Sequence, residues 1–255
     1  MALHVKLTIG LAASAISALA GALTVSTYVA AQSPQQAVDE TETLSIAVGG
    51  QIYDDWFVAL EADEPKATHP SYPAAGRQKG AVTWRCKECH GWDYKGAAGA
   101  YSKGSHFTGI NGIRNRAGGD LADVVRILRD RTHQYTEQMI PESAARKVAL
   151  FVTRGQTDTD TYVDSATKKA RGDAARGAPF FQTICAVCHG QDGKELNFGS
   201  DKTPEYVGTL ARDNPWEGLH KILNGQPGAA MVSLRALNIQ DIVDILAYAQ
   251  TLPAK

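Results

Sequence analysis

The sequence predicts an all-α protein with two similar halves behind an apolar N-terminal segment. Apolar residues recur with the three- and four-residue spacing of an amphipathic helix in both halves, whereas strand signals are weak throughout. These stripes are Leu121, Val124, Val125 and Leu128 in the first half, and Trp216, Leu219, Ile222 and Leu223 in the second. A further apolar helix closes each half: residues 144–152, opened by Pro141, and residues 239–252, stopped by Pro253.

The first 31 residues form an export or anchor segment. Lys6 is their only formal charge, and an apolar run covers residues 7–31. The run exceeds the roughly 20 residues that span a membrane. Small residues at Val29, Ala30 and Ala31 also suit cleavage by a signal peptidase. A cleaved signal peptide and a retained membrane anchor both remain open, and both predict a periplasmic protein, either soluble or tethered to the inner membrane by residues 7–31.

The overall composition is that of an ordinary folded protein. The chain has 255 residues, 44% of them apolar and 21% charged, with a formal net charge of −1. This near-neutral balance argues against nucleic-acid binding. Acidic residues gather in the segment 32–66 and basic residues in 77–131. We expect these two segments to lie near each other, and the alternative is a charged docking face for a redox partner.

The four cysteines occur in two C-x-x-C-H motifs. These are Cys86, Cys89 and His90, and Cys185, Cys188 and His189. C-x-x-C-H is the attachment signature of c-type haem. Two thiols one helical turn apart form thioethers with the two vinyl groups of one haem, and the following histidine lies under the iron. The sequence therefore predicts two covalently attached haem c groups.

Other uses of these cysteines fit the pattern less well. A four-cysteine zinc site has pairs about 15–20 residues apart, whereas these pairs are separated by 96 residues. Two local disulfides would not require the histidines. A thioredoxin-like motif needs a βαβ context, and the sequence has none.

The motifs and the helices that follow them make each half resemble the class I cytochrome c fold. The whole chain resembles an exported dihaem cytochrome c over residues 76–255. The match is best in the second half, where Gly177 and Phe181 precede Cys185 as the first helix of that family would have them. Composition indicates an export or anchor segment (1–31), an acidic extension containing aromatic residues (32–75) and a linker (155–176). The resemblance implies a first cytochrome c domain (76–154) and a second (177–255).

The second axial ligand of each iron has to come from outside the motifs. For the second haem we predict Met231, which follows a Gly/Pro loop where the family has a methionine, over the competitor His220. For the first haem, spacing to the closing helix favours His133 over Met139, and both stay open. His106 and His69 are weaker candidates. A His133 and Met231 pair would give one low and one high potential, because methionine ligation raises the potential of a haem.

Three functions are compatible with these features. The favoured one is a periplasmic electron carrier without catalytic residues, exchanging electrons with redox protein partners. A second possibility is a relay subunit of a larger dehydrogenase or oxidase complex. It would transfer electrons in the same way as the carrier, but its partner would stay bound. A dihaem enzyme, peroxidase-like or a sulfur-compound oxidoreductase, is the alternative.

Overall fold

The computed structural model describes residues 34–74 and 76–254. The predicted export or anchor segment lies outside these residues. Within the part of the chain that is described, no helix combines the length and the apolar character needed to cross a membrane.

The described chain is helical, as predicted. Its only β pairings are two isolated bridges, Gly96 with Asn111 and Val163 with Ala170. The α-helices are α1 (Pro34–Ala59), α2 (Cys86–His90), α3 (Leu121–Leu128), α4 (Glu142–Leu150), α5 (Thr159–Tyr162), α6 (Ala174–Phe180), α7 (Ala186–His189), α8 (Val207–Asp213), α9 (Pro215–Asn224) and α10 (Ile239–Ala249). Shorter turns of other helix types are η1 (Gly80–Trp84), η2 (Arg114–Arg116), η3 (Phe151–Gly155) and η4 (Phe181–Cys185).

The first helical group is built on the crossing of α1 and α4. The helices meet closely at Gly49, where a Cβ atom would overlap the carbonyl oxygen of Lys147. Ile52, Tyr53 and Trp56 of α1 are buried in the same core as residues of α3 and α4. The predicted extension therefore supplies a central helix of the first core, and that core extends across the expected boundary at residue 76.

The second helical group repeats this arrangement with α6 and α10. Gly177 lies at their crossing, where a Cβ atom would overlap the carbonyl oxygen of Asp244. Phe181 follows one turn later and is buried against the second core. That core also includes Trp92 and Tyr101, which come from the loop after the first motif.

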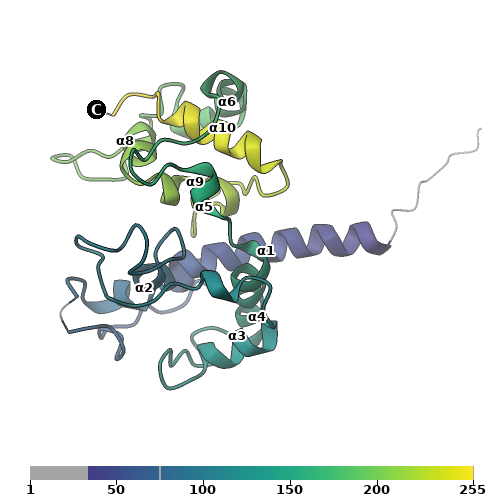
Figure 1. Ribbon diagram of the computed structural model, residues 1–255, viewed down its shortest axis with the longest axis vertical. Coiled ribbons are helices and arrows are strands. Elements are labelled where there is room, and N and C mark those ends of the chain that lie inside the picture. Colours follow the sequence, from purple (N-terminus) through teal and green to yellow (C-terminus); the bar gives the residue numbers. More distant parts are fainter. Residues whose placement is uncertain (1–33, 75, 255) are drawn as a thin grey trace, which may run out of the picture.

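Helix α1 lies between the two groups. In Figure 1 it crosses the middle of the molecule, with α9 and α10 above it and α3 and α4 below. The Nε2 atom of Gln51 donates to the carbonyl of Asn224 in α9 at 2.8 Å. The carbonyl of Gly50 accepts from the Nε2 atom of His220 at 3.0 Å. One helix thus packs on both halves.

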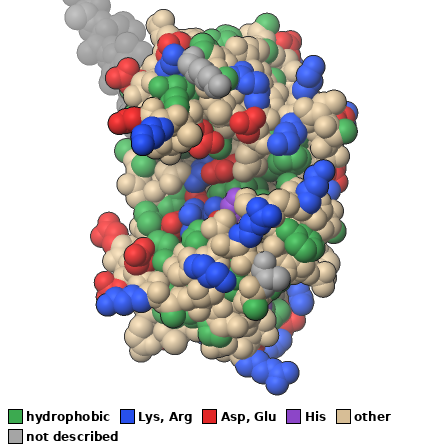
Figure 2. Space-filling model, turned by 90° about the vertical axis from the view of Figure 1, so that its left-hand side faces the viewer, with side chains coloured by type: hydrophobic (Ala, Val, Ile, Leu, Met, Phe, Trp, Pro, Cys, Tyr) green, Lys and Arg blue, Asp and Glu red, His purple; other side chains and the backbone are tan. Residues whose placement is uncertain are grey.

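A buried ion pair joins the halves beside these contacts. Asp54 of α1 pairs with Lys221 of α9 and, at 2.6 Å, with Arg85. Burial would raise the pKa of Asp54, but Lys221 and Arg85 hold it below its usual value. Figure 2 shows acidic and basic side chains gathered with a histidine at the waist between the upper and lower parts. The Asp54 to Arg85 pair confirms that the acidic and basic segments meet.

The expected linker contacts both groups. Thr157 accepts from Arg114 of the first group at 2.7 Å. Lys168 donates to the carbonyl of Asp213, in α8 of the second group, at 2.6 Å. Residues 155–176 also contain α5 and the bridge of Val163, and the segment is ordered and partly buried in the second core.

Candidate functional site

The first C-x-x-C-H motif forms the short helix α2. Burial raises the pKa of the Cys86 thiol to about 11 and that of the Cys89 thiol to about 12. Gly91 ends the helix with φ of 77°, a conformation that glycine adopts readily. Its carbonyl accepts from the Tyr53 hydroxyl of α1 at 2.6 Å. Helix α1 therefore fixes the end of the motif.

His90 is held as a neutral imidazole. Burial lowers the pKa of His90 to about 4. Its Nδ1 atom lies 2.8 Å from the carbonyl oxygen of Asn111 and therefore donates to it. The Nε2 atom is left as the nitrogen with a free lone pair. A hydrogen bond from the other ring nitrogen to a carbonyl is the usual support of a metal-binding histidine.

His133 faces His90 across the loop that precedes α4. The centroids of the two imidazole rings are 6.3 Å apart, and the ring planes are inclined by 30°. The Nδ1 atom of His133 lies 3.1 Å from Oδ1 of Asp130, a partner that favours the proton on Nδ1 and leaves a lone pair on Nε2. The same carboxylate oxygen accepts from the His133 backbone N–H at 2.9 Å. The two imidazoles are thus close together, and each has a hydrogen-bond partner at its Nδ1 atom.

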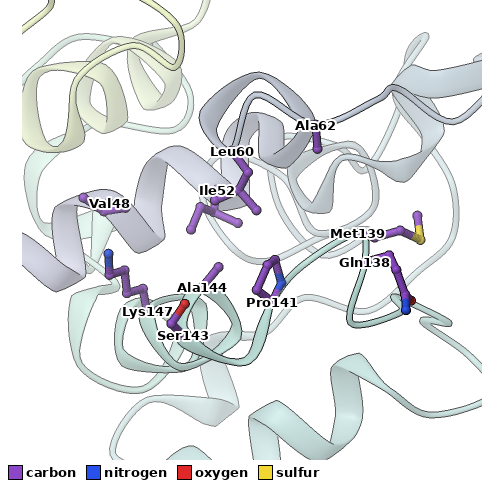
Figure 3. Close-up of a pocket in the computed structure, with 10 residues that line it drawn as sticks. All are labelled: Val48, Ile52, Leu60, Ala62, Gln138, Met139, Pro141, Ser143, Ala144 and Lys147. Carbon is purple, nitrogen blue, oxygen red and sulfur yellow. The ribbon is translucent and has the colours of Figure 1, made fainter.

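Met139 lies in a different environment. It lines a cavity of about 210 Å³ between α1 and the start of α4, together with Ile52, Leu60 and Ala144 (Figure 3). Its side chain packs against the first core. Packing against this core explains why an apolar side chain occupies position 139, next to Ile140.

The second motif spans the end of η4 and all of α7. Burial raises the pKa of the Cys185 thiol to about 11 and lowers that of His189. The Nδ1 atom of His189 is buried and has no hydrogen-bond partner among the described residues. Phe198 packs edge-on against its ring, with centroids 5.8 Å apart. None of the four cysteines of the two motifs forms a disulfide.

The two candidates for the second haem lie in different places. Met231 is half-buried in the loop between α9 and α10, and it stays a prediction. His220 is buried between the two groups. Its Nε2 atom donates to Gly50, and its Nδ1 atom lies 3.0 Å from the Tyr94 hydroxyl. Both nitrogens of His220 are therefore used within the protein.

The two weaker candidates, His106 and His69, form hydrogen bonds with other segments of the first group. The Nδ1 atom of His106 lies 2.8 Å from Glu88 inside the first motif, and its ring stacks on Tyr101. The Nε2 atom of His69 lies 2.8 Å from the carbonyl oxygen of His133. Sequence reasoning missed the contact of His69, which joins segments 64 residues apart.

Comparisons with known proteins agree with these features. A family model described as cytochrome c oxidase, cbb3-type, subunit III matches residues 172–248, which contain the second motif. A cytochrome c-553-like protein from Synechocystis sp. is 33% identical over 105 residues, which make up 41% of this chain and 90% of that protein. The chain belongs to the c-type cytochromes. Such a cytochrome carries covalently bound haem c and exchanges electrons with redox partners.

The residues of the cytochrome fit this cofactor. Each pair of thiols is three residues apart on helical backbone, and a histidine whose pKa is lowered by burial follows each pair. His90 also has an imidazole opposite it. Haem c, once attached, supplies an iron that accepts and releases one electron. The chain itself would supply the thiols and the imidazoles that hold such a group.

Proposed function

We propose that this cytochrome carries two haem c groups, one in each of two class I cytochrome c units, and transfers electrons between protein partners. Cys86, Cys89 and His90 would hold the first haem, with His133 as the second axial ligand. Cys185, Cys188 and His189 would hold the second, with Met231 as its second ligand. The facing rings of His90 and His133 are the observation that carries the proposal.

The ring separation supports bis-histidine ligation. A bond from a metal to an imidazole nitrogen is about 2 Å long, and the nitrogen lies about 1.1 Å from the ring centre, so two imidazoles on opposite sides of one metal have centroids about 6 Å apart. The rings of His90 and His133 are 6.3 Å apart. With both axial positions filled by protein, the first iron has no position for a substrate, which favours a carrier over an enzyme.

The different ligand sets would give the electron a direction. Histidine ligation leaves a haem at lower potential than methionine ligation. Asp130, which accepts from the Nδ1 atom of His133, makes that imidazole a stronger donor and lowers the potential further. Electrons would therefore pass from the haem held at His90 to the haem held at His189.

The second motif has the more open surroundings. Val187, between its two cysteines, is 80% exposed, and Phe198 beside His189 is 45% exposed. Exposed apolar side chains beside a redox centre are suited to a protein partner. We propose a periplasmic location, with residues 7–31 as the export signal or the tether. A relay subunit in a larger complex would use the same surface.

Haem attachment and ligation can be tested separately. We expect the mass of the purified protein to exceed that of its chain by two haems, and the double variant Cys86→Ala/Cys89→Ala to lose one of them.

An electrochemical titration of the haem absorption should give two well-separated one-electron waves. Replacement of His133 by methionine should raise the lower wave, and Met139→Leu is the matched control that should leave it unchanged.

Two overlapping waves at high potential would contradict ligation by His133 and point to Met139. Rapid binding of cyanide or peroxide to the untreated protein would contradict the carrier function and favour the dihaem enzyme. Copurification of the cytochrome with an oxidase or dehydrogenase would identify it as a relay subunit.

A further inference from the structure

His69 is fixed in a single orientation by its own segment. Its Nδ1 atom accepts from the backbone N–H of Ser71 at 3.1 Å, so the ring proton is on Nε2. Its backbone N–H donates to the Thr83 hydroxyl at 2.9 Å. The ring packs on Trp84, with centroids 4.2 Å apart. His69 is buried, and its ring cannot turn without the loss of the Ser71 and Trp84 contacts.

The fixed ring reaches the loop that carries His133. Its Nε2 atom donates to the His133 carbonyl oxygen at 2.8 Å. One residue earlier, the Ser71 hydroxyl donates to the carbonyl of Thr132 at 2.7 Å. The segment that follows α1 therefore forms hydrogen bonds with two successive carbonyl groups of the loop, those of Thr132 and His133.

The backbone at this point needs such support. Gln134, the residue after His133, has φ of 57°, a left-handed conformation that is unfavourable for a residue other than glycine. The carbonyl that His69 holds belongs to the peptide group between His133 and Gln134. The N–H of the same peptide group donates to the Asp130 carbonyl at 2.9 Å. Without the His69 donor, this bond alone holds the peptide group, and the backbone that carries the His133 side chain is less firmly fixed.

We propose that His69 is a positioning residue for the first haem: by holding the His133 carbonyl, it keeps the His133 imidazole opposite His90. This inference rests on the proposed ligation by His133. His69 acts through the backbone of the ligand and touches neither the iron nor the porphyrin.

Carbon monoxide binding tests the proposal in the full-length protein with its haems attached. Carbon monoxide binds a ferrous haem only when an axial ligand leaves. The second haem has the higher proposed potential and is reduced first, so the absorbance change that develops on full reduction reports the first haem. A neutral hydrogen bond is worth about a factor of five in such an equilibrium. We expect His69→Leu to raise carbon monoxide binding at the first haem about fivefold.

Two further variants separate positioning from stability alone. His69→Gln retains an N–H donor and should restore the low binding of the wild type. Thr68→Val removes the hydroxyl that accepts from the Gly80 N–H within the same segment and should lower thermal stability without added carbon monoxide binding. Equal binding in His69→Leu and Thr68→Val would overturn the inference. Strong binding by the wild-type first haem would instead overturn the proposed ligation by His133.

Discussion

Gly49 of α1 and Gly177 of α6 occupy equivalent points in two helix crossings. Each lies where its helix touches the backbone of a later helix, α4 for Gly49 and α10 for Gly177. Each is followed four residues later by a buried aromatic residue, Tyr53 or Phe181. The same close approach of two helices therefore organises both cores.

A side chain at either glycine should destabilise the protein. A Cβ atom at Gly49 would overlap the Lys147 carbonyl, which belongs to helical backbone and cannot move aside. We expect Gly49→Ala and Gly177→Ala each to lower the free energy of unfolding by about 2–3 kcal/mol, as overpacking does. Chemical denaturation measures this change. Leu44→Ala, at an exposed position of α1, should change it by less than about 0.5 kcal/mol.

The buried pair of Asp54 and Lys221 should be costly to break. Lys221→Met keeps the length of the side chain and removes its charge, which leaves Asp54 with Arg85 alone. We expect a loss of about 3 kcal/mol in the free energy of unfolding. The exposed pair of Arg126 and Asp123 is the control, since Arg126→Met should cost less than about 1 kcal/mol. Equal effects would show that burial does not strengthen the pair.

His220 should make the protein sensitive to acid. Burial lowers the pKa of His220 in the folded chain to about 3, whereas an unfolded chain takes up this proton near pH 6.5. The unfolded state therefore binds more protons between these values. The free energy of unfolding should fall as the pH drops from about 6.5 to about 3, by about 1.4 kcal/mol per pH unit from this group. In His220→Gln the slope should be shallower by that amount, and identical slopes would contradict the assignment.

Asp130 should tune the potential of the first haem. Asp130→Asn keeps an oxygen that accepts from the backbone N–H groups of Thr132 and His133 and removes the negative charge. Loss of this charge favours the reduced haem. We expect the lower wave of an electrochemical titration to rise by roughly 50 mV. Asp123→Asn, an exposed carboxylate in α3, should leave both waves in place.

The sequence predicted the parts of the fold whose signals are local. The stripe from Leu121 became α3, and the apolar run after Pro141 became α4 and η3. In the second half, the stripe from Trp216 became α9, and the run from Ile239 became α10. The C-x-x-C-H spacing depends on only five residues and is equally clear.

Helix α1 was missed because its signals are not local. Its buried residues face two partners, α4 on one side and α9 on the other, so they form no single stripe. The correspondence of Gly49 with Gly177 was also hidden by distance, since Cys86 follows Gly49 by 37 residues and Cys185 follows Gly177 by 8. The segment between Gly49 and Cys86 contains His69. Spacing alone could not choose between His133 and Met139, and it could not reveal the contact of His69 with the His133 carbonyl, which joins segments 64 residues apart.

The position of α1 has a consequence for the order in which the chain folds. Gly50 and its partner His220 are 170 residues apart, and Gly49 meets Lys147 of α4. Synthesis proceeds from the N-terminus, so the helix made first gains its last partner almost at the end of the chain. The core around Cys86 takes its last buried residue from Val152, and until that residue is made the core stays unfinished. The thiols of the first motif thus have a period in which they are reachable, before the completed chain encloses them.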